Sequence, residues 1–372
     1  MDLLRLSLSN FRNFARVDSI ELPEASLLVA AAPNAVGKTN FLESMVILLR
    51  GRSWRASSEQ CIRWNAEAFR LEGEVKTIEG KQQLSVSYHR PTRKLRIEEN
   101  NQLASLVTFY SRYPLLIFLP EDSFLFTRGP EQRRNFLNHV LVSSNSYVAA
   151  LVQYQRALRQ RNAALKNAQS FEEIAPWTDL LVTHADAIWK QRQAFITFLE
   201  THLNPLYKEL SGESRTFKIR LSETHEPEKM TELLMQAFSS EQRFGHTSLG
   251  PHRDDFEIET EGHPVKAVLS RGQMRSLTLA LKVAAHRFLK QSTTEEPLLL
   301  LDDVFSELDE KRQRALIEHL PTSQILVTCT TVPQVIRERS DAHILDLRKI
   351  LATPTTLLPA SMVERTQQRV AA

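Results

Sequence analysis

The turn formed by residues 32–39 constrains the fold of this chain more than any other segment. An apolar run at residues 27–31 precedes the turn, and an amphipathic helix is predicted to follow it. The turn ends in Gly37, Lys38 and Thr39. A strand, a glycine-containing turn and a helix in this order are typical of a loop that holds phosphate groups on its backbone N–H groups. The sequence therefore predicts an α/β fold with a phosphate-binding loop, although these eight residues alone leave open a strand–turn–helix that binds nothing.

Several positions of this loop have an expected role. Lys38 would reach the β- and γ-phosphate oxygens of ATP, and the Thr39 hydroxyl would bind Mg²⁺. Ala32 and Ala35 stand where such loops commonly have glycine, and a positive φ at Ala35 would cost about 1 kcal/mol. We expect ATP binding to survive in weakened form, without fast turnover. The residues expected to surround the nucleotide are Ala32, Pro33, Asn34, Ala35, Val36, Gly37, Lys38, Thr39 and Asn40.

A pair of acidic residues follows another apolar strand. Residues 298–301 are four leucines, and Asp302 and Asp303 come directly after them. In an α/β sheet, the residues that follow parallel strands gather at the edge where ligands bind. We expect Asp302 to complete the Mg²⁺ shell and Asp303 to orient or deprotonate the attacking water. Asp303 and Lys38 are therefore the predicted catalytic residues.

A third motif, Leu269-Ser270-Arg271-Gly272-Gln273, opens a strong predicted helix. It matches the LSxGQ signature of ABC ATPases, in which a helix N-terminus forms a second anion cradle. In ABC ATPases this segment contacts the γ-phosphate held by a partner copy, so Ser270, Gly272 and Gln273 are predicted nucleotide ligands across a dimer. Lys38 and Ser270 are much farther apart in this sequence than in a transporter subunit, which excludes a transporter cassette.

The distribution of apolar residues predicts two domains. Alternating and short apolar runs in the first third predict strands, including an antiparallel meander over residues 69–98. From residue 130 onward the apolar spacing turns helical. We expect an α/β fold: an ABC-type P-loop ATPase head with a mixed sheet, built from residues 1–125 and 215–350, a helical arm inserted at 126–214, and a mobile tail at 351–372.

Composition limits the cellular setting. The chain has 372 residues, of which 42% are hydrophobic and 24% are charged, as in an ordinary globular protein. Because its net charge is only +3, any basic surface has to be local. Cys61 and Cys329 are far apart and lack the spacing of a metal site. The N-terminus lacks a signal-peptide pattern, and the apolar runs are too short for a membrane span. We therefore expect a cytoplasmic protein with no membrane partner.

Taken in order, these motifs resemble the RecF family of bacterial DNA-repair ATPases, which is related to the SMC group of ABC proteins. The resemblance implies an ATP-dependent DNA-binding protein of recombinational repair, replication and the SOS response. It would dimerise on ATP, hydrolyse it slowly, and act with RecO and RecR at single-strand gaps to help load a recombinase. The implied partners are single-stranded and duplex DNA, including gapped junctions, a second copy of the chain, and RecO- and RecR-type proteins. Further matching segments lie at residues 10–13, 51–55, 120–122, 129–130, 133–137, 160–166 and 250–255.

Basic residues on one predicted helical segment are the first candidates for DNA contact, because phosphate contacts dominate non-specific affinity. An ordinary solvated helix face is the alternative. Trp54 and Trp64 are expected to lie in the core rather than to stack on bases. The candidates on the helical segment are Arg156, Arg159, Arg161 and Lys166, and a second group on the meander is Arg90, Arg93, Lys94 and Arg96.

Two other functions stay open on the sequence alone. One is a RecF-like scaffold with a degenerate phosphate loop, which recruits proteins to DNA and has little or no ATPase activity. The other is an SMC-like ATPase coupled to a nuclease, which would need a further metal-binding cluster that the sequence does not display.

Overall fold

The computed structural model describes residues 1–24, 27–221, 224–320 and 323–352, without the side chains of residues 351–352. Most of the predicted tail, residues 353–372, lies outside this description. The described chain forms two compact units. Of the described residues, unit 1 comprises those within 1–120, 295–313 and 323–352, and unit 2 comprises those within 121–294 and 314–320.

Unit 1 contains an antiparallel sheet with the strand order β2-β1-β4-β5-β6-β7. Buried and more exposed residues alternate along β4, as they do in a sheet with one packed face and one solvated face. The predicted meander is therefore confirmed. The strands are β1 (Asp2–Phe11), β2 (Phe14–Glu21), β4 (Ala68–Thr77), β5 (Gly80–His89), β6 (Lys94–Glu99) and β7 (Gln102–Leu103).

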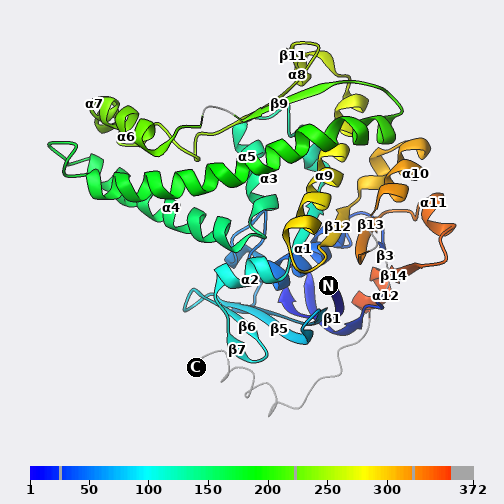
Figure 1. Ribbon diagram of the computed structural model, residues 1–372. Coiled ribbons are helices and arrows are strands. Elements are labelled where there is room, and N and C mark those ends of the chain that lie inside the picture. The colour runs from blue at the N-terminus through cyan, green and yellow to red at the C-terminus, as the bar shows by residue number, and fades with distance from the viewer. Residues whose placement is uncertain (25–26, 222–223, 321–322, 353–372) are drawn as a thin grey trace. The chain divides into compact units, whose positions relative to one another are not determined.

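A second, parallel sheet of unit 1 joins the two ends of the chain. Its order is β14-β3-β13-β12-β8, and every neighbouring pair is parallel. In Figure 1 the blue strand β3 accordingly lies with the orange strands from the end of the chain. Strands buried on both faces need continuous apolar runs, which is why β12 is four leucines before its first acid. The strands are β3 (Leu27–Ala31), β8 (Leu115–Phe118), β12 (Leu298–Asp302), β13 (Ile325–Cys329) and β14 (Ala342–Asp346).

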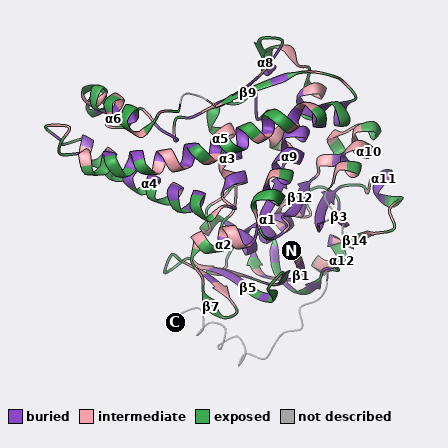
Figure 2. Cartoon of the chain, in the orientation of Figure 1, coloured by how far each residue is buried: buried purple, intermediate pink, exposed green. Residues whose placement is uncertain are grey.

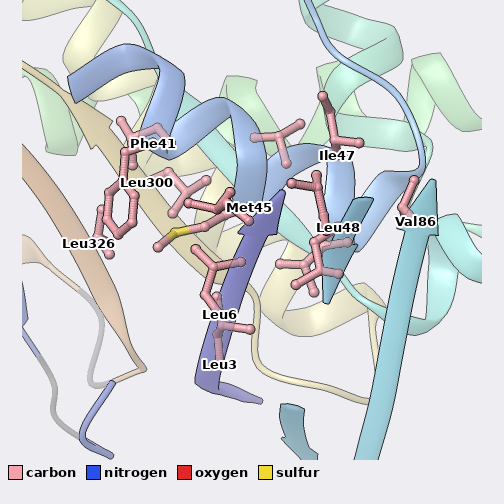
Figure 3. Packing of buried hydrophobic residues seen from close by; sticks show 14 of the residues in the cluster. Leu3, Leu6, Phe41, Met45, Ile47, Leu48, Val86, Leu300 and Leu326 are labelled. Atoms are coloured by element: carbon pink, nitrogen blue, oxygen red, sulfur yellow. The ribbon is translucent and has the colours of Figure 1, made fainter. Parts of the chain in front are cut away.

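The helix α1 (Lys38–Arg50) occupies the core of unit 1 and touches strands of both sheets. Figure 3 shows Phe41 toward Leu300 and Leu326 of the parallel sheet. All of these side chains belong to one buried cluster. Trp54 packs against that cluster, but the core expectation is wrong for Trp64, whose exposed fraction is 90%.

Short elements complete unit 1. They are η1 (Glu59–Cys61), α2 (Leu106–Arg112), η3 (Val304–Glu307), α11 (Gln334–Arg337) and α12 (Leu347–Ala352). Two further elements include residues of both units, namely η2 (Pro120–Phe124) and α10 (Glu310–His319).

Unit 2 is built around two long helices, α4 (Asn145–Leu165) and α5 (Ala175–Ser211), seen in green in Figure 1. They run antiparallel, because Arg161 donates to Thr178 while Arg192 donates to Tyr147. The helical structure predicted from residue 130 onward is therefore confirmed for these segments. The other elements are α3 (Pro130–Leu141), β9 (Phe217–Leu221), α6 (Pro227–Gln236), α7 (Phe238–Phe244), β10 (Phe256–Thr260), β11 (His263–Pro264), α8 (Val265–Val268) and α9 (Arg271–Ser292).

The mixed α/β architecture with an inserted helical segment matches the prediction, but the division of the chain differs. Residues 215–294 fall in unit 2, whereas their strand and helix pattern suggested the head. The reason is packing, since both β9 and α9 pack on the long helix α5. Among the described helices, none combines the length and the apolar character that a bilayer crossing requires.

Candidate nucleotide site

The candidate site lies in unit 1, where the chain leaves β3 and enters α1. Gly37 has a φ of 111°, and a Cβ there would lie 2.7 Å from the side-chain nitrogen of Asn13, so this position requires glycine. Ala35 has a φ of 67°, the strained conformation considered from the sequence, whereas Ala32 has no positive φ. The loop therefore has two left-handed positions, one occupied by an alanine and one by a glycine.

Lys38 is held by three neutral oxygen atoms. Its Nζ donates to the Ala32 carbonyl at 2.9 Å, to Asn34 Oδ1 at 3.1 Å and to Thr330 Oγ1 at 2.9 Å. Thr330 also donates to Asn34 Oδ1 at 3.1 Å. None of these three groups carries a charge, and Lys38 is buried. A buried ammonium without a bonded anion is a favourable partner for a phosphate oxygen.

Thr39 and Asp302 meet at the start of α1 and the end of β12. Thr39 Oγ1 donates to Asp302 Oδ2 at 2.8 Å, and Thr328 Oγ1 donates to Asp302 Oδ1 at 2.6 Å. The two hydroxyls fix the orientation of the buried Asp302 carboxylate. Hydroxyl and carboxylate oxygens are hard ligands of the kind that Mg²⁺ prefers. Thr39 and Asp302 therefore fit the predicted Mg²⁺ site.

Asp303 differs from its neighbour in its surroundings. Its backbone has a φ of 50°, and its N–H donates to Thr328 Oγ1 at 3.1 Å. The Oδ1 atom is buried and has no hydrogen-bond partner among the described residues. Burial raises the pKa of Asp303 above its usual value, and the nearby Asp302 adds to the rise while Lys38 opposes it. A carboxylate with a raised pKa and a free oxygen can accept a proton from water, as the prediction for Asp303 requires.

Three contributing residues received no role from the sequence. Thr328 lies near the end of β13, and Thr330 follows that strand. Both are therefore at the edge of the parallel sheet where ligands bind, the position that also identified Asp302. Asn13 lies in the turn between β1 and β2. It donates to the Val36 carbonyl at 2.9 Å and accepts a bond from Asn40 at 2.7 Å, and thereby braces the loop.

A buried carboxylate of α1 lies at the centre of a second hydrogen-bonded cluster. Glu43 accepts bonds from Arg12 at 2.7 Å, from Arg55 at 2.8 Å and from Ser53 at 2.6 Å. Burial alone would raise the pKa of Glu43, but these hydrogen bonds outweigh it and hold that pKa below its usual value. Arg55 also donates to Asn40 at 2.6 Å. The cluster thus ties α1 to the β1–β2 turn and to the segment after α1.

The signature motif lies in unit 2, at the start of α9. Ser270 caps the helix by accepting the Gln273 N–H at 3.3 Å, and Gln273 Oε1 accepts the Ser270 N–H at 3.0 Å. This reciprocal capping box fixes the first turn, and the Ser270 side of the motif is exposed. Gln273 is further held by a bond to Glu213 at 2.8 Å.

One of the predicted DNA contacts is wrong. The Arg161 side chain is completely buried and pairs with Glu241 at 2.7 Å, so it cannot reach a phosphate group outside the protein. The other three candidates of this group, Arg156, Arg159 and Lys166, are exposed. Figure 2 shows exposed residues in green along α4. Among the residues with a described structure, no group of three or more His, Cys, Asp and Glu side chains forms a metal-ligand set that would favour a nuclease.

Comparisons with known proteins identify the family of this chain. The family model described as the RecF/RecN/SMC N terminal domain matches residues 2–345. The DNA replication and repair protein RecF of Moorella thermoacetica is 33% identical over 339 residues, which cover 89% of this chain and 90% of that protein. The RecF of Exiguobacterium sp. is 32% identical, with 91% and 95% covered.

Solved structures show the same relationship. The recombination mediator protein RecF with ATP, from the RecFOR pathway, has a TM-score of 0.83 at 27% identity, with 93% of this chain and 95% of that chain covered. An Smc head bound to the winged-helix domain of ScpA has a TM-score of 0.53 at 14% identity, which shows a shared fold alone. Given this family match and the extent of the similarity, the chain belongs to the RecF family of DNA replication and repair proteins.

Proposed function

We propose that this chain is a DNA-binding protein of repair and replication in which ATP joins two copies and slow hydrolysis separates them. The observation that carries the proposal is the phosphate loop, in which the bonds of Lys38 to described residues all go to neutral oxygens, while Thr39 and Asp302 lie beside it. Relatives that are named DNA replication and repair proteins, and a RecF solved with ATP, support it.

Nucleotide binding would begin with an exchange of partners at Lys38. Its ammonium would leave Thr330 and Asn34 for the phosphate oxygens, and this frees a hydroxyl and an amide beside the phosphates. The backbone N–H groups of the loop and of the first turn of α1 would bind the remaining oxygens. Thr39 and Asp302 would hold Mg²⁺, which neutralises charge on the phosphates when bound.

Hydrolysis would depend on Asp303. Its unpartnered Oδ1 can accept a hydrogen bond from a water molecule and so orient it for attack. The raised pKa of Asp303 makes the carboxylate a better proton acceptor than an ordinary aspartate.

Dimerisation would bring the signature motif of a second copy onto the γ-phosphate. Ser270, Gly272 and Gln273 are the residues expected to make that contact, and the capped first turn of α9 holds them in place. Arg156, Arg159 and Lys166 remain candidate DNA contacts. RecO- and RecR-type proteins are the proposed partners at gapped DNA, where the dimer would help load a recombinase.

Light scattering tests the proposal directly. The wild-type chain should change from monomer to dimer on addition of ATP and Mg²⁺, with or without DNA, and Lys38→Ala should remain a monomer. Lys229→Ala is a suitable control, because Lys229 is an exposed lysine on α6. ATP-dependent dimerisation that survives in Lys38→Ala contradicts the proposal.

Ala35, an alanine at a left-handed position of the loop, favours one second candidate: a scaffold with a degenerate phosphate loop that recruits proteins to DNA and has little or no ATPase activity. Such a scaffold would bind DNA equally well with and without nucleotide and release no phosphate. A monomer under every condition of the light-scattering experiment, together with nucleotide-independent DNA binding, identifies this second function.

A further inference from the structure

One end of the antiparallel sheet presents a tryptophan to solvent. Trp64 lies in the segment between η1 and β4, and 90% of its surface is exposed. Large aromatic side chains are costly to leave in water and commonly mark binding surfaces. No other described large hydrophobic residue of the chain is as exposed. This ring therefore has an aromatic face free for a ligand.

Backbone hydrogen bonds join three segments at this end of the sheet. Arg12 N–H donates to the Cys61 carbonyl at 2.8 Å, and Arg63 N–H donates to the Asn10 carbonyl at 2.8 Å. The β5–β6 turn is attached in the same way, since the N–H of its first residue donates to the Glu67 carbonyl at 2.8 Å. The strand register agrees, because Ala68 at the start of β4 pairs with the last residue of β5. The β1–β2 turn, the Trp64 segment and the β5–β6 turn thus form one surface.

This surface is strongly basic. Residues 10–16, 52–67 and 89–94 contain eight Lys and Arg and two acidic residues. Three of the cations pair with acidic residues outside these ranges, Arg12 and Arg55 with Glu43 and Arg16 with Asp18. Glu59, one of the two acidic residues within the ranges, already pairs with Arg90 at 3.5 Å. Within the described residues, four of the cations form no ion pair, and a polyanion would therefore be attracted to them. They are Arg52, Arg63, Arg93 and Lys94.

The Trp64 segment is also held in one conformation. Ala66 N–H donates to the Arg63 carbonyl at 3.1 Å and closes a tight turn around the tryptophan. Asn65 has a φ of 65°, a left-handed value that asparagine tolerates well. The Arg63 side chain donates to the Asn13 carbonyl at 3.1 Å. Because this turn is already hydrogen-bonded before binding, little conformational entropy is lost when a ligand binds to it.

We propose that Trp64 is a stacking platform for an unpaired base of single-stranded DNA, whose phosphates meet Arg63, Arg93 and Lys94. The inference deepens the proposed DNA-binding function and rests on it. Stacking suits an aromatic ring on a basic surface, because every base has a π-face and the contact does not depend on sequence. Paired bases inside a duplex keep their faces covered, so this contact distinguishes single strands from duplex DNA. An acidic protein segment could use the cations but has no equivalent use for the exposed ring.

The test measures fluorescence anisotropy with the full chain and three labelled probes of equal length: an oligo(dT) strand, an abasic strand and a duplex. Trp64→Ala should weaken oligo(dT) binding roughly 5- to 150-fold, the range expected for one lost base–aromatic stack. Trp64→Phe should retain most of the affinity. The slope of affinity against salt should stay unchanged in both variants, because no charge is removed.

Affinity for the abasic strand and the duplex should be the same in Trp64→Ala as in the wild type. The control is Ile78→Ala, since Ile78 is 70% exposed in the β4–β5 turn at the opposite end of the same sheet. It should bind all three probes normally. Because both side chains are exposed, the thermal unfolding midpoints of the variants should match that of the wild type.

Several outcomes overturn the inference. If Trp64→Ala binds oligo(dT) as tightly as the wild type, the stacking inference is refuted and the proposed DNA binding stands. The same holds if Trp64→Ala loses equal affinity for the oligo(dT) and abasic strands. A polyglutamate peptide that binds the wild type but not Trp64→Ala, while oligo(dT) binding is unchanged, assigns the surface to an acidic protein partner. A wild-type chain that binds none of the DNA probes refutes the proposed function together with the inference.

Discussion

Replacing Ala35 by glycine should stabilise the chain. Ala35 has a φ of 67°, and an L-residue with a side chain pays about 1–2 kcal/mol in the left-handed region. Glycine avoids that cost but loses about 0.5–1 kcal/mol more backbone entropy on folding than alanine. The net gain for Ala35→Gly is therefore about 0.5–1 kcal/mol in the free energy of unfolding. Urea titrations of the nucleotide-free protein measure it directly.

The effect on ATP binding should be small. The strain at Ala35 is present in the nucleotide-free loop, so it is a cost of folding rather than a cost of binding. We expect the Kd for ATP, measured by calorimetry, to change by less than about threefold, a difference of about 0.7 kcal/mol. A tenfold tighter Kd would show that the loop changes its backbone path on binding, and would refute this reasoning.

A matched control lies three residues earlier in the same loop. Ala32 is buried and has no positive φ, so Ala32→Gly relieves no strain. It should instead lose about 1–2 kcal/mol, through added chain entropy and one lost buried methyl group. Opposite signs for the two alanine-to-glycine changes are the expected result. Destabilisation by both substitutions contradicts the argument from φ.

The remaining predictions concern buried polar groups. Glu43→Gln should cost about 3 kcal/mol at neutral pH, because it removes a buried charge bonded to two arginines. Folding lowers the pKa of Glu43, so its stabilising contribution is present above the unfolded-state pKa of about 4 and is lost as the pH falls through the lower folded-state pKa. In urea titrations at decreasing pH below about 5, Glu43→Gln should therefore lose less stability than the wild type. Arg161→Met should lower the free energy of unfolding by about 3–5 kcal/mol, because it leaves the Glu241 carboxylate buried without its cation. The double variant with Glu241→Leu should recover part of that loss. Full additivity of the two single effects in the double-mutant cycle would contradict the ion pair. Burial raises the pKa of Cys61 and of Cys329 to about 11, so mass spectrometry should find neither alkylated by iodoacetamide at pH 7 in the folded protein and both alkylated in urea.

Local patterns predicted the elements that carry the site. An apolar run predicts a strand buried on both faces, and a turn with Gly37, Lys38 and Thr39 predicts a phosphate loop. Both patterns can be recognised because they involve residues that are neighbours in the sequence. The same logic identified Asp302 at the end of a parallel strand, and the structure places it 2.8 Å from Thr39. These inferences needed no knowledge of distant contacts.

Partners that are distant in sequence were beyond such patterns. Thr330 reaches Lys38 only because β13 and β3 are neighbours in the parallel sheet. Arg161 resembled a solvated helix residue, and its burial depends on Glu241, which another helix supplies. Periodicity reports which residues of a helix face inward on average, but a charged side chain is buried only where the fold brings it a countercharge.

By itself, the sequence determined the type of fold, the phosphate loop and the acidic strand end, because these follow from local spacing and from the general geometry of parallel sheets. The tertiary structure alone decided the grouping of residues 215–294 with the long helices, the burial of Arg161 and the exposure of Trp64. Each of these depends on which surfaces pack together. Burial is a property of the assembled chain, since a side chain is removed from water by residues that are close to it in space, however far they lie from it in sequence.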